Sequence, residues 1–384
     1  PDAPLEAHNT RNTVVATLAK LQMLVAEPTE LLPQLAMQNQ MLACLHWLGQ
    51  FQILAFIPHQ GSIALEDIAE LADVPEGQLR RIVRMTAAAG FLHESQPGHV
   101  EHTALSAPFG NTPSYHDALM FLTTTAAPAA MQMVAVTQRL RHQQRLLQGT
   151  AYNDLPLAAS FQQQATLRRQ WPSYLKYALG DQDSSIASIL NSFDWESIGE
   201  ATVVDVGARS TAMACALAEC HPSLKLIVQM STSPDPLTEL DSRPELDSRI
   251  VVQGRSWGMP QTVRDAAVYA LRVPYDFPAV FAQSRPARLR AELEAHLGVL
   301  RDNEAARLIL TARLLPHHDA AAAEDLDGGV FQPDVDAARG LVFDMSLLQL
   351  ANDRELEVAD LSVLVRSVGD ANGHLVLEGK LQAY

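Results

Sequence analysis

The stretch that decides the fold is VVDVGARSTAMACALAE, residues 203–219. An apolar run ends at Asp205 and Gly207, and small apolar residues then continue with a pattern that favours a helix. A buried strand, a glycine turn and a helix in this order are typical of nucleotide-binding α/β domains. The turn, residues 207–211, reads GARST, whereas such turns usually carry several glycines. The stretch therefore predicts a cofactor-binding fold and leaves open whether the cofactor site is still used.

Alternation of strands and helices continues from about residue 200 onward. Strands are predicted at ATVVDV, LKLIVQ, RIVVQ, AVYAL and ARLILTARLL, helices near residues 210–220, 236–242, 286–302 and 336–350, and a last strand at HLVLEGKL. Apolar strands that alternate with helices form a mostly parallel, doubly wound α/β sheet. Ligands of such sheets bind at the carboxyl ends of the strands, here after Val206 and Gln229.

The part of the chain before this sheet is predicted to be mostly helical. Residues 10–57 carry helical periodicity with little charge, which favours a dimer interface over a purely intrachain core. Ser62 is expected to cap the helix LEDIAELA, a second helix should end at Gly90, and FLHE and HVEHT should form a hairpin. This order predicts a winged helix. We therefore predict a helical dimerisation and winged-helix domain (1–112), a helical linker (113–195) and a doubly wound domain (196–384).

Composition narrows the classes of partner. The formal net charge is −16, which argues against nucleic acid as a ligand. Three cysteines, Cys44, Cys215 and Cys220, form no even disulfide framework and favour a reducing compartment. No apolar run reaches the roughly 18 residues of a membrane span, and PDAPLEAHNT does not resemble a signal peptide. We expect a soluble cytoplasmic protein without a nucleic-acid or membrane partner.

Motifs for metal binding or nucleophilic catalysis are weak. His317, His318 and Asp319 are adjacent but lie in an alanine-rich segment, and the sequence holds no HExxH, no paired-cysteine spacing and no Gly-x-Ser-x-Gly. We therefore predict no metal site and no nucleophilic residue.

The order of these parts resembles a known family. The strings VVDVG, HPSLKLIVQ, AAVYALR, ILTARLLP and MSLLQLANDRELE follow one another as they do in the fungal S-adenosylmethionine-dependent O-methyltransferases. The chain is most similar to the methyltransferase-like pericyclases of that family. The resemblance implies a class I methyltransferase-like Rossmann domain over residues 196–384, and it implies a homodimer formed through the N-terminal helices.

The chain departs from the family at three places. In the cofactor turn, glycines of the family are replaced by Ala208, Arg209 and Thr211. The end of the second strand reads QMS, residues 229–231, and has no carboxylate. The histidine base of the family is replaced by Tyr275. The resemblance then implies that Asp205 and Gly207 are relics of a cofactor site. It implies that no cofactor is required, with S-adenosylmethionine possible as a ligand that is not consumed.

A pericyclase is the activity this pattern favours. Such an enzyme would guide dehydration or a Diels–Alder, hetero-Diels–Alder or Alder-ene step on a polyketide or pyridone natural-product intermediate, by holding and polarising it. Arg272 and Tyr275 would donate hydrogen bonds to a carbonyl, and His116 or Asp276 would move a proton. The candidates for lining the substrate pocket are Phe121, Met131, Trp171, Tyr174, Phe277, Met345, Leu348 and Asn352.

Structural roles remain open for the same residues. Arg272 and Asp276 could form an ion pair, His116 could begin a helix, Asn352 could be a satisfied polar group, and the methionines and aromatics could be core. Two other functions also remain open: a diverged O-methyltransferase of secondary metabolism, and a non-catalytic pseudo-methyltransferase that binds or regulates an active partner.

Overall fold

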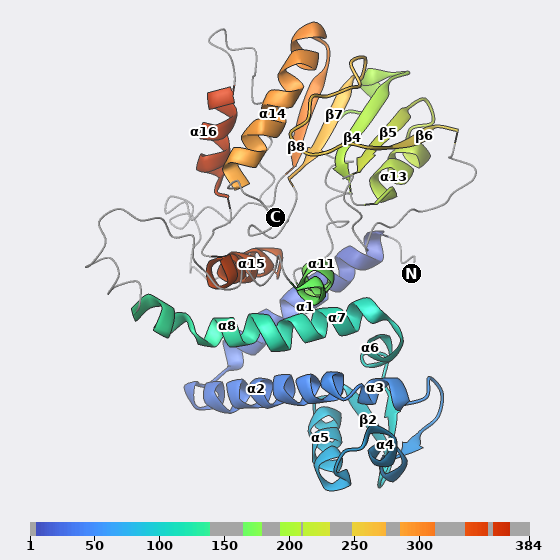
Figure 1. The fold of residues 1–384 in the computed structure, drawn as a ribbon, viewed down its shortest axis with the longest axis vertical. Helices are drawn as coiled ribbons and strands as arrows, with labels where there is room; N and C mark the ends of the chain where they lie inside the picture. The colour runs from blue at the N-terminus through green and yellow to red at the C-terminus, as the bar shows by residue number, and fades with distance from the viewer. Residues whose placement is uncertain are drawn as a thin grey trace. The chain divides into compact units, whose positions relative to one another are not determined.

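The computed structural model describes residues 5–138, 164–178, 193–208, 210–230, 248–273, 285–311, 335–351 and 356–368 of the 384-residue chain (Figure 1). Two compact units are distinguished: residues 17–179, called the helical unit, and residues 1–16 with 180–384, called the sheet unit. The predicted domain boundaries at residues 112 and 195 stay a prediction.

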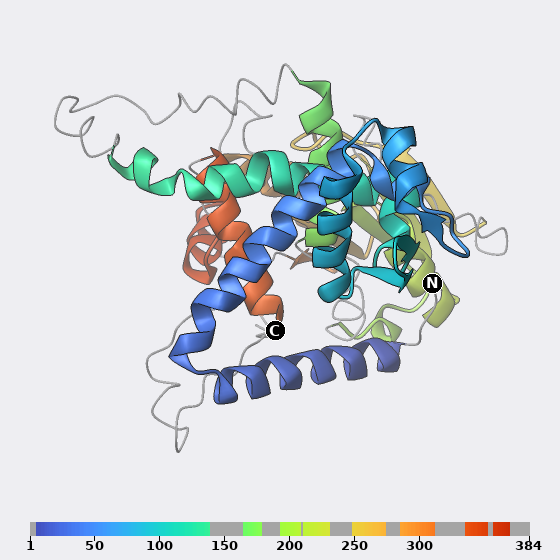
Figure 2. The same ribbon diagram turned by 90° about the horizontal axis from the view of Figure 1, so that it is seen from below.

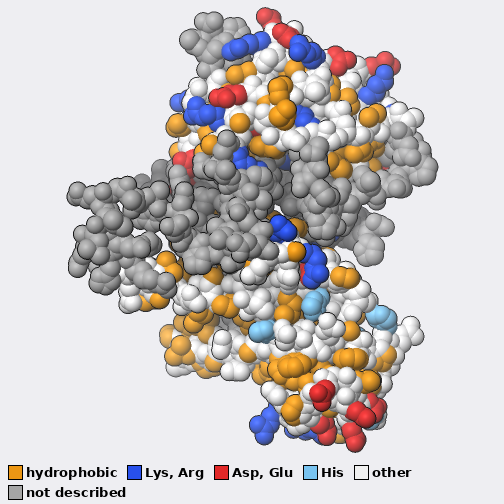
Figure 3. All heavy atoms as spheres, viewed as in Figure 1, with side chains coloured by type: hydrophobic (Ala, Val, Ile, Leu, Met, Phe, Trp, Pro, Cys, Tyr) orange, Lys and Arg blue, Asp and Glu red, His pale blue; other side chains and the backbone are white. Residues whose placement is uncertain are grey.

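The helical unit begins with long helices. Helix α1 (Leu5–Val25) spans the boundary between the units, and α2 (Pro28–Gln50) and α3 (Ile53–Phe56) follow. Helix α2 runs as one continuous helix although it contains Pro33 (Figure 2). Apolar side chains gather over its N-terminal half on the face seen in Figure 3. The exposed apolar residues of this half are Leu31, Leu32, Leu35 and Met37.

The predicted pair of helices with a hairpin is present. Helices α4 (Leu65–Ala72) and α5 (Glu76–Ala88) are flanked by strands β1 (Ile63–Ala64), β2 (Leu92–Gln96) and β3 (His99–His102), which form an antiparallel sheet in the order β1-β3-β2. The prediction that Ser62 caps α4 was wrong. Strand β1 pairs with β3 as far as Ala64, so the helix begins only after that residue.

Further helices complete this unit. They are α6 (Ala107–Asn111), α7 (Pro113–Phe121), a π turn η1 (Leu122–Ala126), α8 (Ala127–Met131) and α11 (Ala165–Ala178). The hydroxyls of Thr123 and Thr124 donate to the carbonyls of Leu119 and Met120 at the π turn. Side-chain hydroxyls that bond to the preceding turn commonly accompany such irregular helical turns.

A five-stranded sheet organises the sheet unit. After a short 3-10 turn η2 (Glu196–Ile198) come β4 (Thr202–Ala208), β5 (Lys225–Met230), β6 (Ile250–Gly254), β7 (Val268–Arg272) and β8 (Arg307–Thr311). All neighbours are parallel, in the order β6-β5-β4-β7-β8. All five strands were predicted. The predicted doubly wound α/β fold is therefore confirmed.

Helices cover both faces of this sheet (Figure 1). Helix α13 (Ala212–Cys220) packs with one set of alternate strand residues, and α14 (Arg285–Asp302) and α16 (Val358–Val368) pack with the other set. Helices α13, α14 and α15 (Val335–Ala351) confirm three of the four predicted helices. The predicted helix 236–242 and the last predicted strand lie outside the described residues.

Candidate functional site

The carboxyl ends of β4 and β7 bring Asp205 and Arg272 together. Asp205 lies opposite Ala270 in the register, so the side chain of Arg272, two residues further along β7, projects on the same face of the sheet. Arg272 donates from Nε to Asp205 Oδ1 at 3.2 Å and from Nη2 to Oδ2 at 2.6 Å. The two side chains are 10% and 1% exposed. The pair is therefore a buried, bidentate ion pair.

Burial and pairing act on Asp205 in opposite directions. Burial raises the pKa of the Asp205 carboxyl, and the nearby Arg272 guanidinium works against that rise by favouring the carboxylate. Two donors of a planar guanidinium on one carboxylate are the geometry that best offsets desolvation. The structural ion pair left open for Arg272 is thus formed, with Asp205 as its partner. Asp276, the partner named from the sequence, lies outside the described residues.

Trp257 lies against the glycine of the turn. Gly207 has a φ of +72°, and a Cβ built on it would lie 2.8 Å from the indole ring of Trp257. The indole is held by a hydrogen bond from its Nε1 to the carbonyl of Arg288, at 3.1 Å. The indole therefore packs directly against the turn, and a side chain at position 207 would collide with it.

The end of β5 carries amides in place of a carboxylate. Gln229 donates to Gln261 Oε1 at 2.7 Å, and Gln261 donates back to Gln229 Oε1 at 2.9 Å. Both side chains are buried, and Met230, the next residue of β5, is also buried. The end of β5 therefore presents amides that bond to each other, and it offers no carboxylate to accept hydrogen bonds from the hydroxyls of a ribose.

This amide pair continues into a buried cluster on α14. The second amide hydrogen of Gln261 points to His296 Nε2 at 3.1 Å, and His296 Nδ1 donates to the carbonyl of Glu292 at 2.8 Å. Arg255 donates to the Glu292 carboxylate at 2.5 Å. Burial lowers the pKa of His296, while the carbonyl and carboxylate of Glu292 act against that shift and Arg255 adds to it. The arrangement fits a neutral imidazole with its proton on Nδ1.

The described residues do not fit S-adenosylmethionine in the position that the fold implies. Trp257 packs against the glycine turn, and Asp205 of β4 is paired with Arg272. The end of β5 carries amides that are hydrogen-bonded to each other. Arg209, the residue expected to crowd the sulfonium, lies outside the described residues.

His116 has a structural partner in the helical unit. Its Nε2 donates to the carbonyl of Gly49 at 3.1 Å, which ties α7 to α2. The helices touch closely here, because a Cβ on Gly49 would lie 2.9 Å from Met120 Sδ. The predicted catalytic role of His116 stays a prediction, and its position at the start of α7 agrees with the structural alternative.

Three of the predicted pocket residues pack together as core. The ring centroid of Phe121 lies 5.4 Å from that of Trp171 and 4.9 Å from that of Tyr174, and all three side chains are buried. Met131, at the end of α8, is 86% exposed. The structure therefore brings the aromatic residues together and leaves Met131 on the surface of this unit.

The remaining candidates belong to the sheet unit. Met345 and Leu348 are exposed on α15. Tyr275, Asp276, Phe277 and Asn352 lie outside the described residues, as do His317, His318 and Asp319. Within the described ranges no group of acidic, histidine or cysteine side chains could hold a metal ion. No helix in these ranges is long and apolar enough to cross a membrane.

Sequence reasoning missed the buried cluster around His296. One signal was available: Leu289, Glu292, Leu293 and His296 follow the three- and four-residue spacing of a helix face that packs on a core. An acid and a histidine at core positions one turn apart indicate a buried polar network. Trp257 carried no comparable signal, because its contact with Gly207 depends on the path of the loop after β6.

Solved structures share this fold. The structure of LepI in complex with SAM matches with a TM-score of 0.62 at 14% identity, over 94% of this chain and 88% of that chain. The mitomycin 7-O-methyltransferase MmcR matches with a TM-score of 0.57 at 16% identity, over 89% and 91%. At this identity the likeness shows the fold, which is that of class I methyltransferases. No family model matches the chain.

Proteins with higher sequence identity to this chain carry the names of regulatory proteins. The agnestins biosynthesis cluster transcriptional coactivator of Paecilomyces divaricatus is 43% identical over 392 residues, which cover 100% of this chain and 85% of that protein. The monodictyphenone cluster transcriptional coactivator of Emericella nidulans is 38% identical over 429 residues, covering 99% and 87%. This chain therefore belongs to the family of fungal transcriptional coactivators of secondary-metabolite clusters, built on a methyltransferase-like fold.

Proposed function

We propose that this chain is a transcriptional coactivator of a secondary-metabolite gene cluster and that its methyltransferase-like fold serves protein binding rather than methyl transfer. The observation that carries the proposal is the closed cofactor turn, in which Trp257 covers Gly207 and Arg272 pairs with Asp205. In this role the chain would need no cofactor. The names of the relatives that match nearly the whole chain support the same conclusion.

A coactivator acts through a protein that is itself bound to DNA. The net charge of −16 agrees with an indirect role, since DNA phosphates require a basic surface. In the helical unit, Arg80 of α5 donates to Glu76 of the same helix, so its charge is already paired. This proposal requires the chain to reach the nucleus, in contrast to the cytoplasmic location expected from the sequence. A fluorescent fusion distinguishes the two locations.

Deleting the gene distinguishes a coactivator function from an enzymatic function. In the deletion strain we expect transcripts of the neighbouring biosynthetic genes to fall and to recover when the intact gene is returned. Unchanged transcripts, together with accumulation of one late intermediate, would overturn the proposal in favour of catalysis. Expressing the biosynthetic genes from an independent promoter in the deletion strain is the control, because a coactivator is then dispensable and an enzyme is not.

A pericyclase is the second candidate. A solved structure described as a pericyclic reaction enzyme matches with a TM-score of 0.62 at 14% identity, over 94% of this chain and 88% of that chain. In this candidate a natural-product intermediate would be held and polarised by the residues predicted from the sequence, Arg272 among them. It is favoured if the deletion strain accumulates a substrate that the purified protein converts. A methylated product formed with S-adenosylmethionine would instead indicate a diverged O-methyltransferase.

A second copy of the chain is the partner proposed for the N-terminal helices. Leu18, Leu21 and Leu24 of α1 and Leu31 and Leu32 of α2 are all at least half exposed. Exposed apolar runs of this kind commonly become buried at subunit interfaces. The homodimer predicted from the sequence therefore remains a proposal.

A further inference from the structure

We propose that residues 255–263, called the 255–263 loop, stay docked on α14 only while His296 is neutral, so that protonation of His296 releases the loop. This loop is the first part of the segment between β6 and β7. The direction of the hydrogen bonds around His296 carries the proposal, which goes beyond the coactivator function and does not depend on it.

Polar contacts hold the 255–263 loop along one side of α14. One oxygen of the buried Glu292 carboxylate accepts from the side chain of Arg255, and the other accepts the backbone N–H of Gly258. Further along the loop, the backbone N–H of Gln261 donates to the carbonyl of Ala295 at 3.2 Å. The loop is therefore attached to α14 at successive turns of the helix, and the side chain of His296 lies one turn beyond Glu292.

A backbone group fixes the direction of the hydrogen bonds around His296. The N–H of Val263 donates to Gln261 Oε1 at 3.1 Å, and a backbone N–H can only donate. The Nε2 hydrogens of Gln261 therefore point to Gln229 Oε1 at 2.9 Å and to His296 Nε2 at 3.1 Å. His296 Nε2 must then accept, while its Nδ1 donates to the carbonyl of Glu292 at 2.8 Å. Only the neutral imidazole with its proton on Nδ1 satisfies both bonds.

A second proton on His296 has no acceptor in this arrangement. It would lie on Nε2 and face the amide hydrogens of Gln261, which places two donors against each other. Turning over the amide of Gln261 would place its hydrogens against the backbone N–H of Val263 instead. His296 is 0% exposed, so water cannot supply the missing acceptor while the loop stays docked. Protonation therefore favours a state in which the loop has left α14 and water reaches the imidazolium.

The charged and titratable groups that face His296 within the described residues are Glu292, Arg255 and Tyr269. Glu292 Oε1 lies 3.6 Å from His296 Nδ1 and would attract an imidazolium, but the same carboxylate is paired with Arg255. The ring of Tyr269 lies edge-on to the imidazole with centroids 5.5 Å apart, and its hydroxyl donates to the carbonyl of Val263 at 2.7 Å. Burial has the largest influence on the pKa of His296 and lowers it, which agrees with the neutral form that the hydrogen bonds require.

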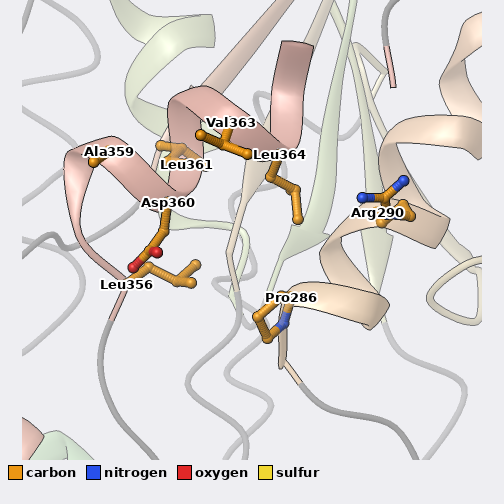
Figure 4. Close-up of a pocket in the computed structure, with 8 residues that line it drawn as sticks. All are labelled: Pro286, Arg290, Leu356, Ala359, Asp360, Leu361, Val363 and Leu364. Carbon is orange, nitrogen blue, oxygen red and sulfur yellow. The ribbon is translucent and has the colours of Figure 1, made fainter. Parts of the chain in front are cut away.

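Helix α14 has a second contact, on another face. Pro286 and Arg290 border a pocket of about 360 Å³ that residues of α16 complete (Figure 4). Leu289 and Leu293 are buried in the core that α14 and α16 share with the sheet. These contacts do not involve the 255–263 loop, so the loop rather than α14 is expected to move.

Hydrogen exchange of the full chain tests the release of the loop. Peptides covering residues 255–263 are followed from about pH 8 to about pH 5, with rates corrected for the effect of pH on exchange itself. Below pH 6.5 the released loop binds one more proton than the docked loop, so its protection should fall by up to about tenfold per pH unit. At each pH the loop should exchange faster than β4, because it opens without unfolding of the sheet. Protection that does not change with pH, or that equals the protection of β4 throughout, would overturn the proposal.

A matched pair of variants assigns the effect to one histidine. His296→Gln keeps a side chain that can accept and donate a hydrogen bond but does not titrate, so the loop should lose its dependence on pH. His221→Gln makes the same change at a half-buried residue after α13 and should keep the wild-type dependence. A loop that responds to pH equally in His296→Gln and in the wild type would show that the proposal is wrong.

Fluorescence gives a second measurement that leaves His296 unchanged. Trp257 lies in the loop, and its indole packs against the turn at Gly207. Quenching of tryptophan fluorescence by acrylamide should therefore increase as the pH falls below about 6.5, the ordinary pKa of histidine. Trp257→Phe should remove this increase, because the other tryptophans lie outside the loop. No increase in the wild type, or an increase that Trp257→Phe retains in full, would contradict release of the loop.

Discussion

Removing Arg272 should destabilise the sheet unit rather than alter a reaction. Its side chain is 10% exposed and that of Asp205 is 1% exposed, so water cannot replace the lost partner. Breaking a buried pair by removing one member costs about 3–5 kcal/mol, because the other charge stays buried and unpaired. We therefore expect Arg272→Met to lower the free energy of unfolding of the sheet unit by about this amount.

The double variant provides the reference for this measurement. Asp205→Leu combined with Arg272→Met removes both charges, and replacement of a buried pair by apolar residues is often neutral or stabilising. The double variant should therefore be more stable than either single variant. A double-mutant cycle with both single variants isolates the coupling between the two side chains.

Hydrogen exchange reads out each unit separately, which a single unfolding curve of a two-unit chain cannot do. Peptides covering β4 and β7 should exchange faster in Arg272→Met by about two to three and a half orders of magnitude, the equivalent of the lost stability. Peptides covering α4 and α5 serve as the internal control. Protection of β4 that remains within tenfold of wild type, or a double variant as weak as the single, would refute the reasoning.

Four further results are expected. Burial lowers the pKa of His296 from about 6.5, so below that pH the unfolded chain binds more protons than the folded chain. The free energy of unfolding should therefore fall as the pH drops below this value. In urea titrations, His296→Gln should weaken this dependence of stability on pH. Gly207→Ala should lower the hydrogen-exchange protection of the sheet unit by more than Gly61→Ala lowers that of the helical unit, because both glycines have positive φ but a Cβ on Gly61 meets only open space; equal losses would contradict the contact with the indole. Calorimetric titration with S-adenosylmethionine should give no saturable heat, and micromolar binding would reopen the methyltransferase alternative. Leu32→Glu should shift sedimentation from dimer to monomer, while Leu71→Glu, at an exposed position on another helix, leaves it unchanged. A wild-type monomer would contradict the proposed homodimer.

The sequence predicted the sheet well because its strands are short apolar runs with clear ends. Val203, Val204 and Val206 are fully buried in β4, as a parallel strand covered on both faces requires. Helix α16 was missed, although Leu361, Leu364, Val365 and Val368 follow helical spacing.

The candidate site was less predictable because it depends on contacts between distant residues. The sequence indicated that Arg272 could be paired, but its partner, Asp205, is 67 residues away and is set by strand order. In the same way, the Gln229–Gln261 pair requires the loop after β6 to return over the sheet. Composition and spacing do not determine such contacts.

The reciprocal amide pair at the end of β5 has a consequence for how this family can change. A carboxylate at Gln229 alone would face the side-chain oxygen of Gln261 in a buried site, and a change at Gln261 alone would leave Gln229 and His296 each short of a partner. A single substitution that places a carboxylate at the end of β5 should therefore lower stability unless its partner changes with it.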